Sequence, residues 1–115
     1  MTYIPKHKVH CQALFEELAL NDPGALLTLL KPEAGLKVSD LTFAAEIAGR
    51  ALPTELVESL LLDLLKHECP AVREGALYGL DNHPTSAVCE AVKRMAFVDP
   101  SPAIRSVAVE WMDRD

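Results

Sequence analysis

The chain has 115 residues, half of them hydrophobic but only 5% aromatic, and its formal net charge is −6. This length fits one domain, and a core built mainly from leucine, valine and alanine suits close-packed helices. The acidic charge opposes contact with a phosphate backbone, so we expect no nucleic-acid partner. No apolar run approaches the roughly 18 residues that cross a bilayer, so we expect no membrane partner either.

The first residues lack the apolar core of a secretory signal, so we expect a cytoplasmic protein. The three cysteines, Cys11, Cys69 and Cys89, are an odd number with no close pair, which argues against a disulfide framework. We expect buried thiols instead.

In the N-terminal half, apolar residues at helical spacing predict a helix over residues 8 to 20 that covers one open end of the domain. Its apolar stripe consists of Cys11, Leu14, Phe15 and Leu18. Asp22-Pro23 pairs a cap with a first-turn proline and predicts a short helix through Leu30. After a break at residues 31–35, Ser39 or Asp40 can cap another helix, whose small apolar face contains Leu41, Ala44, Ala45 and Ala48.

Prolines predict the helix boundaries of the C-terminal half. Pro53 and Pro84 fit the first turn of a helix, where a missing N–H costs nothing, and Thr85 or Ser86 can cap. The expected first helices run over roughly residues 53 to 66 and 85 to 97. Prolines 70, 100 and 102 disfavour helical geometry in the residue before each. The chain therefore turns there, before second helices over roughly residues 71 to 80 and 102 to 113.

This half of the chain also repeats itself after a shift of 32 residues. Pro70-Ala71-Val72-Arg73 lies over Pro102-Ala103-Ile104-Arg105, and Ala76 lies over Ala108. The same shift places the apolar residues Leu56, Val57, Leu60, Leu64 and Leu65 over Val88, Cys89, Val92, Ala96 and Phe97. We therefore expect repeats over residues 53–81 and 82–113, preceded by a capping helix and a degenerate repeat over residues 8–52, in a single domain of residues 1–115.

The two copies resemble HEAT repeats, particularly the short bacterial form of phycobilisome lyase-like proteins, whose second helix opens with a proline turn, Val-Arg and a spaced Ala. The resemblance covers about residues 53 to 113, and residues 1–52 match only in helical pattern. It implies an all-α fold, a right-handed superhelical stack of antiparallel helix pairs, or α-solenoid, of about six to seven helices. It also implies that the second helices line the inner side, which often binds partners, but the architecture serves many unrelated functions.

In that family an Asp before the turn commonly pairs with the Arg of the second helix, and Asp99 and Arg105 preserve both members. In the upstream copy His67 and Glu68 stand at this turn instead, so we expect Arg73 to pair with Glu68 or to meet turn carbonyls. We interpret Arg73, Asp99 and Arg105 as structural turn residues, because a guanidinium at a fixed turn ties two helices together. An anion site is the alternative.

The sequence His67-Glu68-Cys69 offers three kinds of metal ligand, but consecutive residues on a turn rarely converge on one ion. HEAT-like iron oxygenases use His-Glu dyads that recur in several repeats, and here Asp99-Pro100 cannot supply a second dyad. We therefore expect no metal at this turn.

His7, His10 and Cys11 share one helical face, yet Cys11 belongs to the apolar stripe, where a buried thiol simply packs. No glycine-rich phosphate loop or nucleophile motif is present. Gly75 and Gly79 lie inside a helix, where we expect them to let neighbouring helices approach closely. We predict no catalytic residue, no metal and no cofactor.

The surface most suited to binding consists of the second-helix positions that remain after the apolar face is removed. These are Glu74, Tyr78 and Asp81 in one copy and Ser106, Glu110 and Asp113 in the other, with Thr42, Glu46 and Arg50 corresponding upstream. We call Glu74, Tyr78, Asp81, Glu110 and Asp113 the acidic face. An acidic surface with one exposed aromatic anchor suits a basic protein or peptide segment. A solvated face without a partner is the alternative.

The last copy ends at Asp115, with no extra helix to cover its outer side. We expect Trp111 and Met112 to be partly exposed, which favours a homodimer through residues 102–113 or docking of a larger partner. The alternative is that Trp111 folds back against Phe97 or Met95.

The sequence thus predicts a non-catalytic protein–protein interaction module: an adaptor, a scaffold, or an inhibitor or immunity-like protein that covers a basic active site. The alternative is a minimal relative of HEAT-like lyases or metal-dependent oxygenases, with His67, Glu68 and Cys69 near a ligand. DNA binding, as in HEAT-like glycosylases, needs a basic inner surface that Glu74 and Glu110 contradict.

Overall fold

The computed structural model describes the backbone of residues 6–113 and the side chains of residues 11–113. Within these residues the fold is all-helical and contains no strand. The α-helices are α1 (Lys6–Asn21), α2 (Pro23–Leu29), α3 (Val38–Ala51), α4 (Thr54–Leu64), α5 (Pro70–Gly79), α6 (Ser86–Val98) and α7 (Pro102–Met112), with 3-10 helices η1 (Pro32–Ala34) and η2 (Leu80–Asn82). None of these helices is both long enough and apolar enough to span a bilayer.

The helices begin close to where caps and prolines predicted them. Asp22 and Thr85 accept hydrogen bonds from backbone N–H groups in the first turns of α2 and α6, and Pro70 and Pro102 open α5 and α7. The predicted cap of the third helix was wrong. Helix α3 begins at Val38, before both Ser39 and Asp40, and its N-terminal residue has no side-chain cap. Asp40 lies buried in the first turn, where its negative charge suits the helix dipole.

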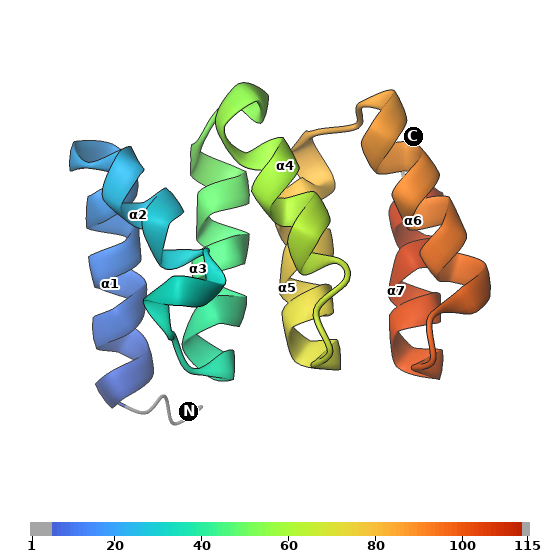
Figure 1. Ribbon diagram of the computed structural model, residues 1–115, viewed down its shortest axis with the longest axis horizontal. Coiled ribbons are helices and arrows are strands. Elements are labelled where there is room, and N and C mark those ends of the chain that lie inside the picture. The colour runs from blue at the N-terminus through green and yellow to red at the C-terminus, as the bar shows by residue number, and fades with distance from the viewer. Residues whose placement is uncertain (1–5, 114–115) are drawn as a thin grey trace.

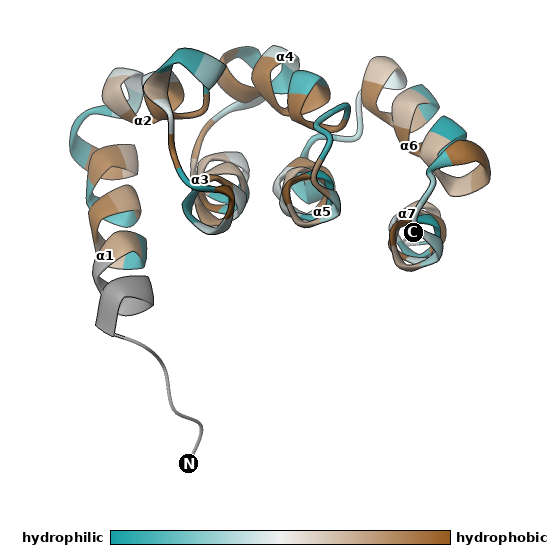
Figure 2. Cartoon of the chain, turned by 60° about the horizontal axis from the view of Figure 1, so that its bottom comes forward, coloured by the Kyte–Doolittle hydropathy of each residue, from teal (hydrophilic) through white to brown (hydrophobic). Residues whose placement is uncertain are grey.

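The helices lie in two layers (Figures 1 and 2). Helices α3, α5 and α7 run side by side in one layer, with α1 packed against α3. Helices α2, α4 and α6 form the other layer. The core lies between the layers and contains side chains from both, including the fully buried Leu26, Val57, Leu61, Val72 and Leu77.

Helices α3 and α5 approach so closely that their backbones touch. A Cβ atom on Gly75 would lie 2.6 Å from the carbonyl oxygen of Thr42, and one on Gly79 would lie 2.6 Å from that of Ala45. A Cβ atom on Gly49 would overlap the carbonyl group of Gly79. The predicted role of Gly75 and Gly79 is therefore confirmed, and Gly49 is the partner that the sequence did not reveal.

The predicted buried faces of the first helices were partly wrong. Cys89 and Phe97 are exposed, and the exposed fraction of Phe97 is 74%. The residues that are buried are Val57, Leu61 and Leu64 in α4 and Val88, Val92 and Met95 in α6. These sets correspond after a shift of 31 residues, whereas Val72 and Ala76 of α5 correspond to Ile104 and Ala108 of α7 after 32. If the 32-residue shift is applied to the whole repeat, the first helices are misaligned by one residue. One residue corresponds to a rotation of about 100° around the helix axis, so a different face is predicted to be buried.

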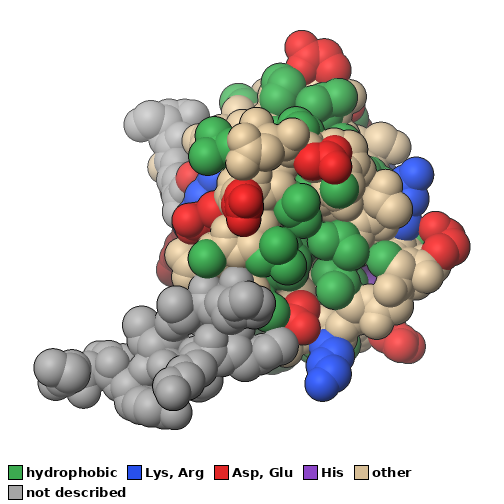
Figure 3. All heavy atoms as spheres, turned by 90° about the vertical axis from the view of Figure 1, so that its left-hand side faces the viewer, with side chains coloured by type: hydrophobic (Ala, Val, Ile, Leu, Met, Phe, Trp, Pro, Cys, Tyr) green, Lys and Arg blue, Asp and Glu red, His purple; other side chains and the backbone are tan. Residues whose placement is uncertain are grey.

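Helix α1 lies at one end of the molecule and packs against α2 and α3 (Figure 1). Cys11 and Phe15 are buried as predicted, but Leu14 is exposed. Leu20, near the C-terminal end of α1, is 84% exposed. Hydrophobic side chains gather on this end of the molecule (Figure 3). The side chains of His7 and His10 lie outside the described residues.

Candidate functional site

Glu74 and Tyr78 of the acidic face lie on α5, Asp81 lies in η2, and Glu110 and Asp113 lie in and directly after α7, which packs against α5. Glu110 and Asp113 are exposed, and Glu74 and Asp81 are partly exposed. Tyr78 is also only partly exposed, and both it and Asp81 already interact with other groups of the protein. The expectation of an exposed aromatic anchor is therefore met only in part.

The corresponding positions on α3 do not extend the negative charge. Glu46 and Arg50 form an ion pair one helical turn apart. Thr42 donates a hydrogen bond from its hydroxyl to the carbonyl oxygen of Val38. Because the α3 charges cancel, the acidic residues that could face a partner in this layer lie in and just after α5 and α7.

The turn residues form a clamp between the two C-terminal helix pairs. Arg73 donates from Nε to Asp99 Oδ2 at 2.8 Å and from Nη2 to Asp99 Oδ1 at 2.9 Å, and both side chains are buried. Its Nη1 donates to the carbonyl oxygens of His67 and Glu68 at 2.9 and 3.1 Å. This one guanidinium therefore joins the α4–α5 turn to the α6–α7 turn, in a bidentate geometry that only arginine provides.

The predicted pairing of Asp99 with Arg105 was wrong. The carboxylate of Asp99 binds Arg73 of the preceding helix pair, and Arg105 donates from Nη1 to the backbone carbonyl oxygen of Asp99 at 2.6 Å. Asp99 Oδ1 also accepts the N–H of Ser101, which fixes the turn. Of the two alternatives for Arg73, the turn carbonyls are correct and the Glu68 side chain is not its partner.

A buried histidine, which the sequence did not single out, links three elements. His83 lies after η2, and its Nε2 is 2.6 Å from the carbonyl oxygen of Gly49 at the end of α3. Its Nδ1 is 2.7 Å from the hydroxyl of Thr54 in the first turn of α4. A carbonyl can only accept, so Nε2 donates to Gly49, and the second ring nitrogen, Nδ1, pairs with the Thr54 hydroxyl. Both ring nitrogens are satisfied, which makes His83 a structural link.

At the α4–α5 turn, His67 Nδ1 accepts the backbone N–H of Cys69 at 3.0 Å. Glu68 is exposed and Cys69 is partly buried. Among the described side chains, no group of three or more His, Cys, Asp or Glu residues lies close enough to hold a metal ion.

The cysteines differ in their surroundings, and the prediction of three buried thiols was wrong. All three are free, but only Cys11 is buried, whereas Cys89 is exposed. Burial and the neighbouring carboxylate of Asp40, which also forms a hydrogen bond with the thiol, raise the pKa of Cys11. The thiolate is the reactive form of cysteine, so the raised pKa and the burial make Cys11 less reactive than an ordinary exposed thiol.

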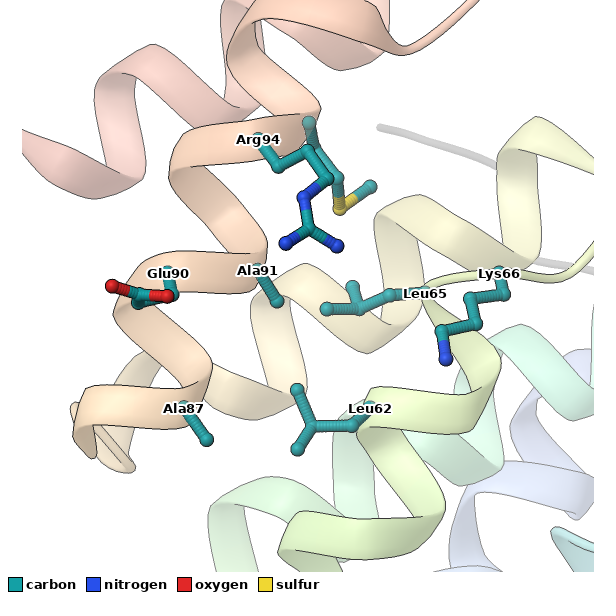
Figure 4. A pocket seen from close by; sticks show the side chains of 8 residues that line it. Leu62, Leu65, Lys66, Ala87, Glu90, Ala91 and Arg94 are labelled. Carbon is teal, nitrogen blue, oxygen red and sulfur yellow. The ribbon is translucent and has the colours of Figure 1, made fainter.

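A hollow of about 330 Å³ opens between α4 and α6, and the sequence did not predict it (Figure 4). Leu62 and Leu65 line one side and Ala91 the other. The guanidinium of Arg94 reaches over the hollow, and the ammonium of Lys66 lies at its edge. Glu90 also lines the hollow, so two cations and one carboxylate surround its apolar floor.

Trp111 and Met112 are partly exposed, as predicted, and their remaining surface packs against the core. The indole Nε1 of Trp111 is buried and has no hydrogen-bond partner among the described residues. Phe97 is largely exposed, so it is Phe97, rather than Trp111, that presents the larger apolar surface at this end. The predicted homodimer through residues 102–113 stays a prediction.

No protein-family model, curated protein or solved structure matches the chain. The resemblance to HEAT repeats therefore rests on the residue pattern of the two copies.

Proposed function

We propose that the protein is a non-catalytic protein–protein interaction module that binds a basic protein or peptide segment on the acidic face. The observation that carries this proposal is the set of accessible carboxylates in and just after α5 and α7. Glu110 and Asp113 are exposed to solvent, and Glu74 on the neighbouring helix α5 is partly exposed. In the same layer the cations Arg50 and Arg73 are paired with Glu46 and Asp99, and Arg105 donates to the carbonyl oxygen of Asp99.

We further propose that α4–α5 and α6–α7 are HEAT-like repeats in a right-handed superhelical stack, with α2–α3 as a degenerate pair and α1 as the capping helix. Two features support this architecture. Arg73 and Arg105 occupy equivalent positions after a proline turn, and each donates to carbonyl oxygens of its own turn. The first and second helices of the pairs also lie in separate layers. In such a stack the acidic face lies on the inner side.

Charge reversal on the acidic face tests the function. Affinity capture from the source lysate, with wild type beside a Tyr78→Ala, Glu74→Lys variant, identifies a partner, and titration then measures its Kd. We expect Glu74→Lys with Glu110→Lys to raise the Kd at least tenfold, about 1.4 kcal/mol, because two attractive contacts become repulsive.

A matched control reverses Glu33 and Glu90, which are exposed residues outside the acidic face. Both double variants change the net charge equally, so long-range attraction weakens equally in both. Equal losses of affinity in the two variants would show that the acidic face is not the binding surface.

A further inference from the structure

The outer side of α7 repeats a surface that is covered elsewhere in the molecule. Arg73, Leu77 and Leu80, in and just after α5, correspond after 32 residues to Arg105, Val109 and Met112 of α7. The first three are buried, Leu77 and Leu80 completely. Val109 is 43% exposed, and Arg105 and Met112 are partly exposed. Helix α7 packs against α5, and the turn before it carries Asp99, whereas no described element packs against α7 from the other side.

The covering of α5 shows what this kind of surface recognises. The turn between α6 and α7 presents the Asp99 carboxylate, which accepts two hydrogen bonds from Arg73. Arg73 also donates to carbonyl oxygens of its own turn, and Arg105 does the same, since its Nη1 donates to the carbonyl oxygen of Asp99. No described carboxylate is paired with the Arg105 guanidinium, so its Nε and Nη2 donors lack the partner that Arg73 has.

The residue types on α7 also suit a covered surface. Val109 and Met112 retain the apolar character of the buried Leu77 and Leu80. A hollow of about 500 Å³ lies beside Arg105 and Val109, between Pro102 and Glu110. Phe97 and Val98, directly before the α6–α7 turn, are exposed as well. Cation, hollow and apolar residues therefore lie at one end of the molecule.

We propose that the outer side of α7 docks a helix pair of another protein, whose connecting turn presents an aspartate to Arg105. The carboxylate would accept two parallel hydrogen bonds from Arg105, as Asp99 does from Arg73, and apolar side chains of the partner would cover Val109 and Met112. A second copy of this chain is a poorer occupant, because its own Asp99 is already buried against Arg73. The proposal does not rest on binding at the acidic face, although Glu110 of that face also lines the hollow beside Arg105.

A synthetic peptide of residues 84–113, with blocked termini, is the probe, since it contains the helix pair and the aspartate that cover α5. Titration of the ¹⁵N-labelled full-length protein by NMR should give saturable shifts at Val109, Met112 and the Arg105 Nε–H. We expect Arg105→Gln in the protein, or Asp99→Asn in the peptide, to raise the Kd at least tenfold. Arg94→Gln, which removes an equal charge from an exposed position of α6, should leave the Kd within about twofold.

Because Arg105 also holds its own turn, thermal unfolding of Arg105→Gln must show that the variant remains folded. Val109→Asp provides a second test, since it changes an exposed side chain and should weaken binding at least tenfold without disturbing the core. Binding weaker than about 1 mM would overturn the proposal, as would equal affinity for wild type and Arg105→Gln. Shifts at Arg73 and Leu77 in place of α7 would also overturn it, because the peptide would then be displacing the protein's own α6–α7 pair.

Discussion

Helix α5 is held on its two sides by different kinds of interaction. Towards α3 the contact is between backbones, which can touch because Gly49, Gly75 and Gly79 have no side chains. Towards α6 and α7 it is made by a long side chain, because Arg73 reaches across to the turn at Asp99. The first contact requires close fit along its whole length, whereas the second requires one correctly placed carboxylate. Of the two kinds of contact, only the arginine–carboxylate contact has an equivalent position, Arg105, at which we propose that another protein binds.

The largest effect should come from adding a methyl group at the glycine contact. A Cβ atom on Gly49 would overlap the carbonyl group of Gly79, and a backbone cannot move aside as a flexible side chain can. Alanine favours a helix over glycine by about 1 kcal/mol, but the overlap outweighs this gain. We expect Gly49→Ala to lower the free energy of unfolding by about 4 kcal/mol or more, measured by urea denaturation.

Gly24→Ala is the control for that substitution. Gly24 also lies in a helix, and the nearest atom to its Cβ position, Oδ1 of Asp22, is at an ordinary distance of 3.8 Å. This variant should gain about 0.5 kcal/mol from helix propensity. A similar loss in both variants would mean that the helix interiors, and not the α3–α5 contact, require glycine.

The clamp on the other side should come second in magnitude. Asp99→Ala leaves the buried Arg73 guanidinium without its counter-charge and removes the acceptor for the Ser101 N–H. We expect a loss of about 3 kcal/mol, measured by the same denaturation. Glu46→Ala removes the more exposed Glu46–Arg50 pair on α3 and should cost less than about 0.5 kcal/mol, because water screens that pair. Equal losses would show that burial does not distinguish the two ion pairs.

Local sequence signals predicted where most helices begin, whereas the errors concern side chains whose partners lie far away in the sequence. Prolines and caps act within one helical turn, so the starts of α2, α5 and α7 could be predicted closely. Asp99 and Arg73 are 26 residues apart, whereas Arg105 is a close neighbour of Asp99 in the sequence. The family pattern, which pairs the Asp with the Arg of the helix that follows it, therefore favoured the wrong arginine.

The buried side of α6 could not be predicted from hydrophobicity because its candidates are equally apolar. Phe97 was expected to face the core and Met95 was not, yet Met95 is buried and Phe97 is exposed. The two connections differ in length, with five residues between α4 and α5 and three between α6 and α7. Helix α6, however, continues three residues past Met95, whereas α4 ends at the equivalent Leu64, so the downstream pair has one residue more between equivalent core positions. His83 gave no signal either, since a histidine before a proline resembles an ordinary loop residue.

A smaller effect should come from the hydrogen bonds at the end of the glycine contact. His83 joins the carbonyl oxygen of Gly49 to the hydroxyl of Thr54, so it ties α4 to the point where α3 and α5 are closest. Thr54→Val keeps the shape of the side chain but leaves the buried Nδ1 of His83 unpaired. We expect a loss of about 1.5 kcal/mol. Thr28→Val, which removes an exposed hydroxyl bonded to the carbonyl oxygen of Gly24, should change the stability by less than about 0.5 kcal/mol.

The smallest effect concerns the contact between α1 and α3, where the thiol of Cys11 meets the carboxylate of Asp40. Burial and this carboxylate raise the pKa of Cys11 above its ordinary value of 9.0, so the folded protein holds the thiol proton more tightly than the unfolded chain does. The resulting stability is present below about pH 9 and is lost as the pH rises further, because the unfolded chain then releases the proton first. Denaturation between about pH 8 and pH 10 should show a steeper fall for wild type than for Cys11→Ala, whose side chain cannot ionise. Parallel pH curves would show that Asp40 does not oppose the Cys11 thiolate, and the α1–α3 contact would then resemble the glycine contact, held by shape without a contribution from charge.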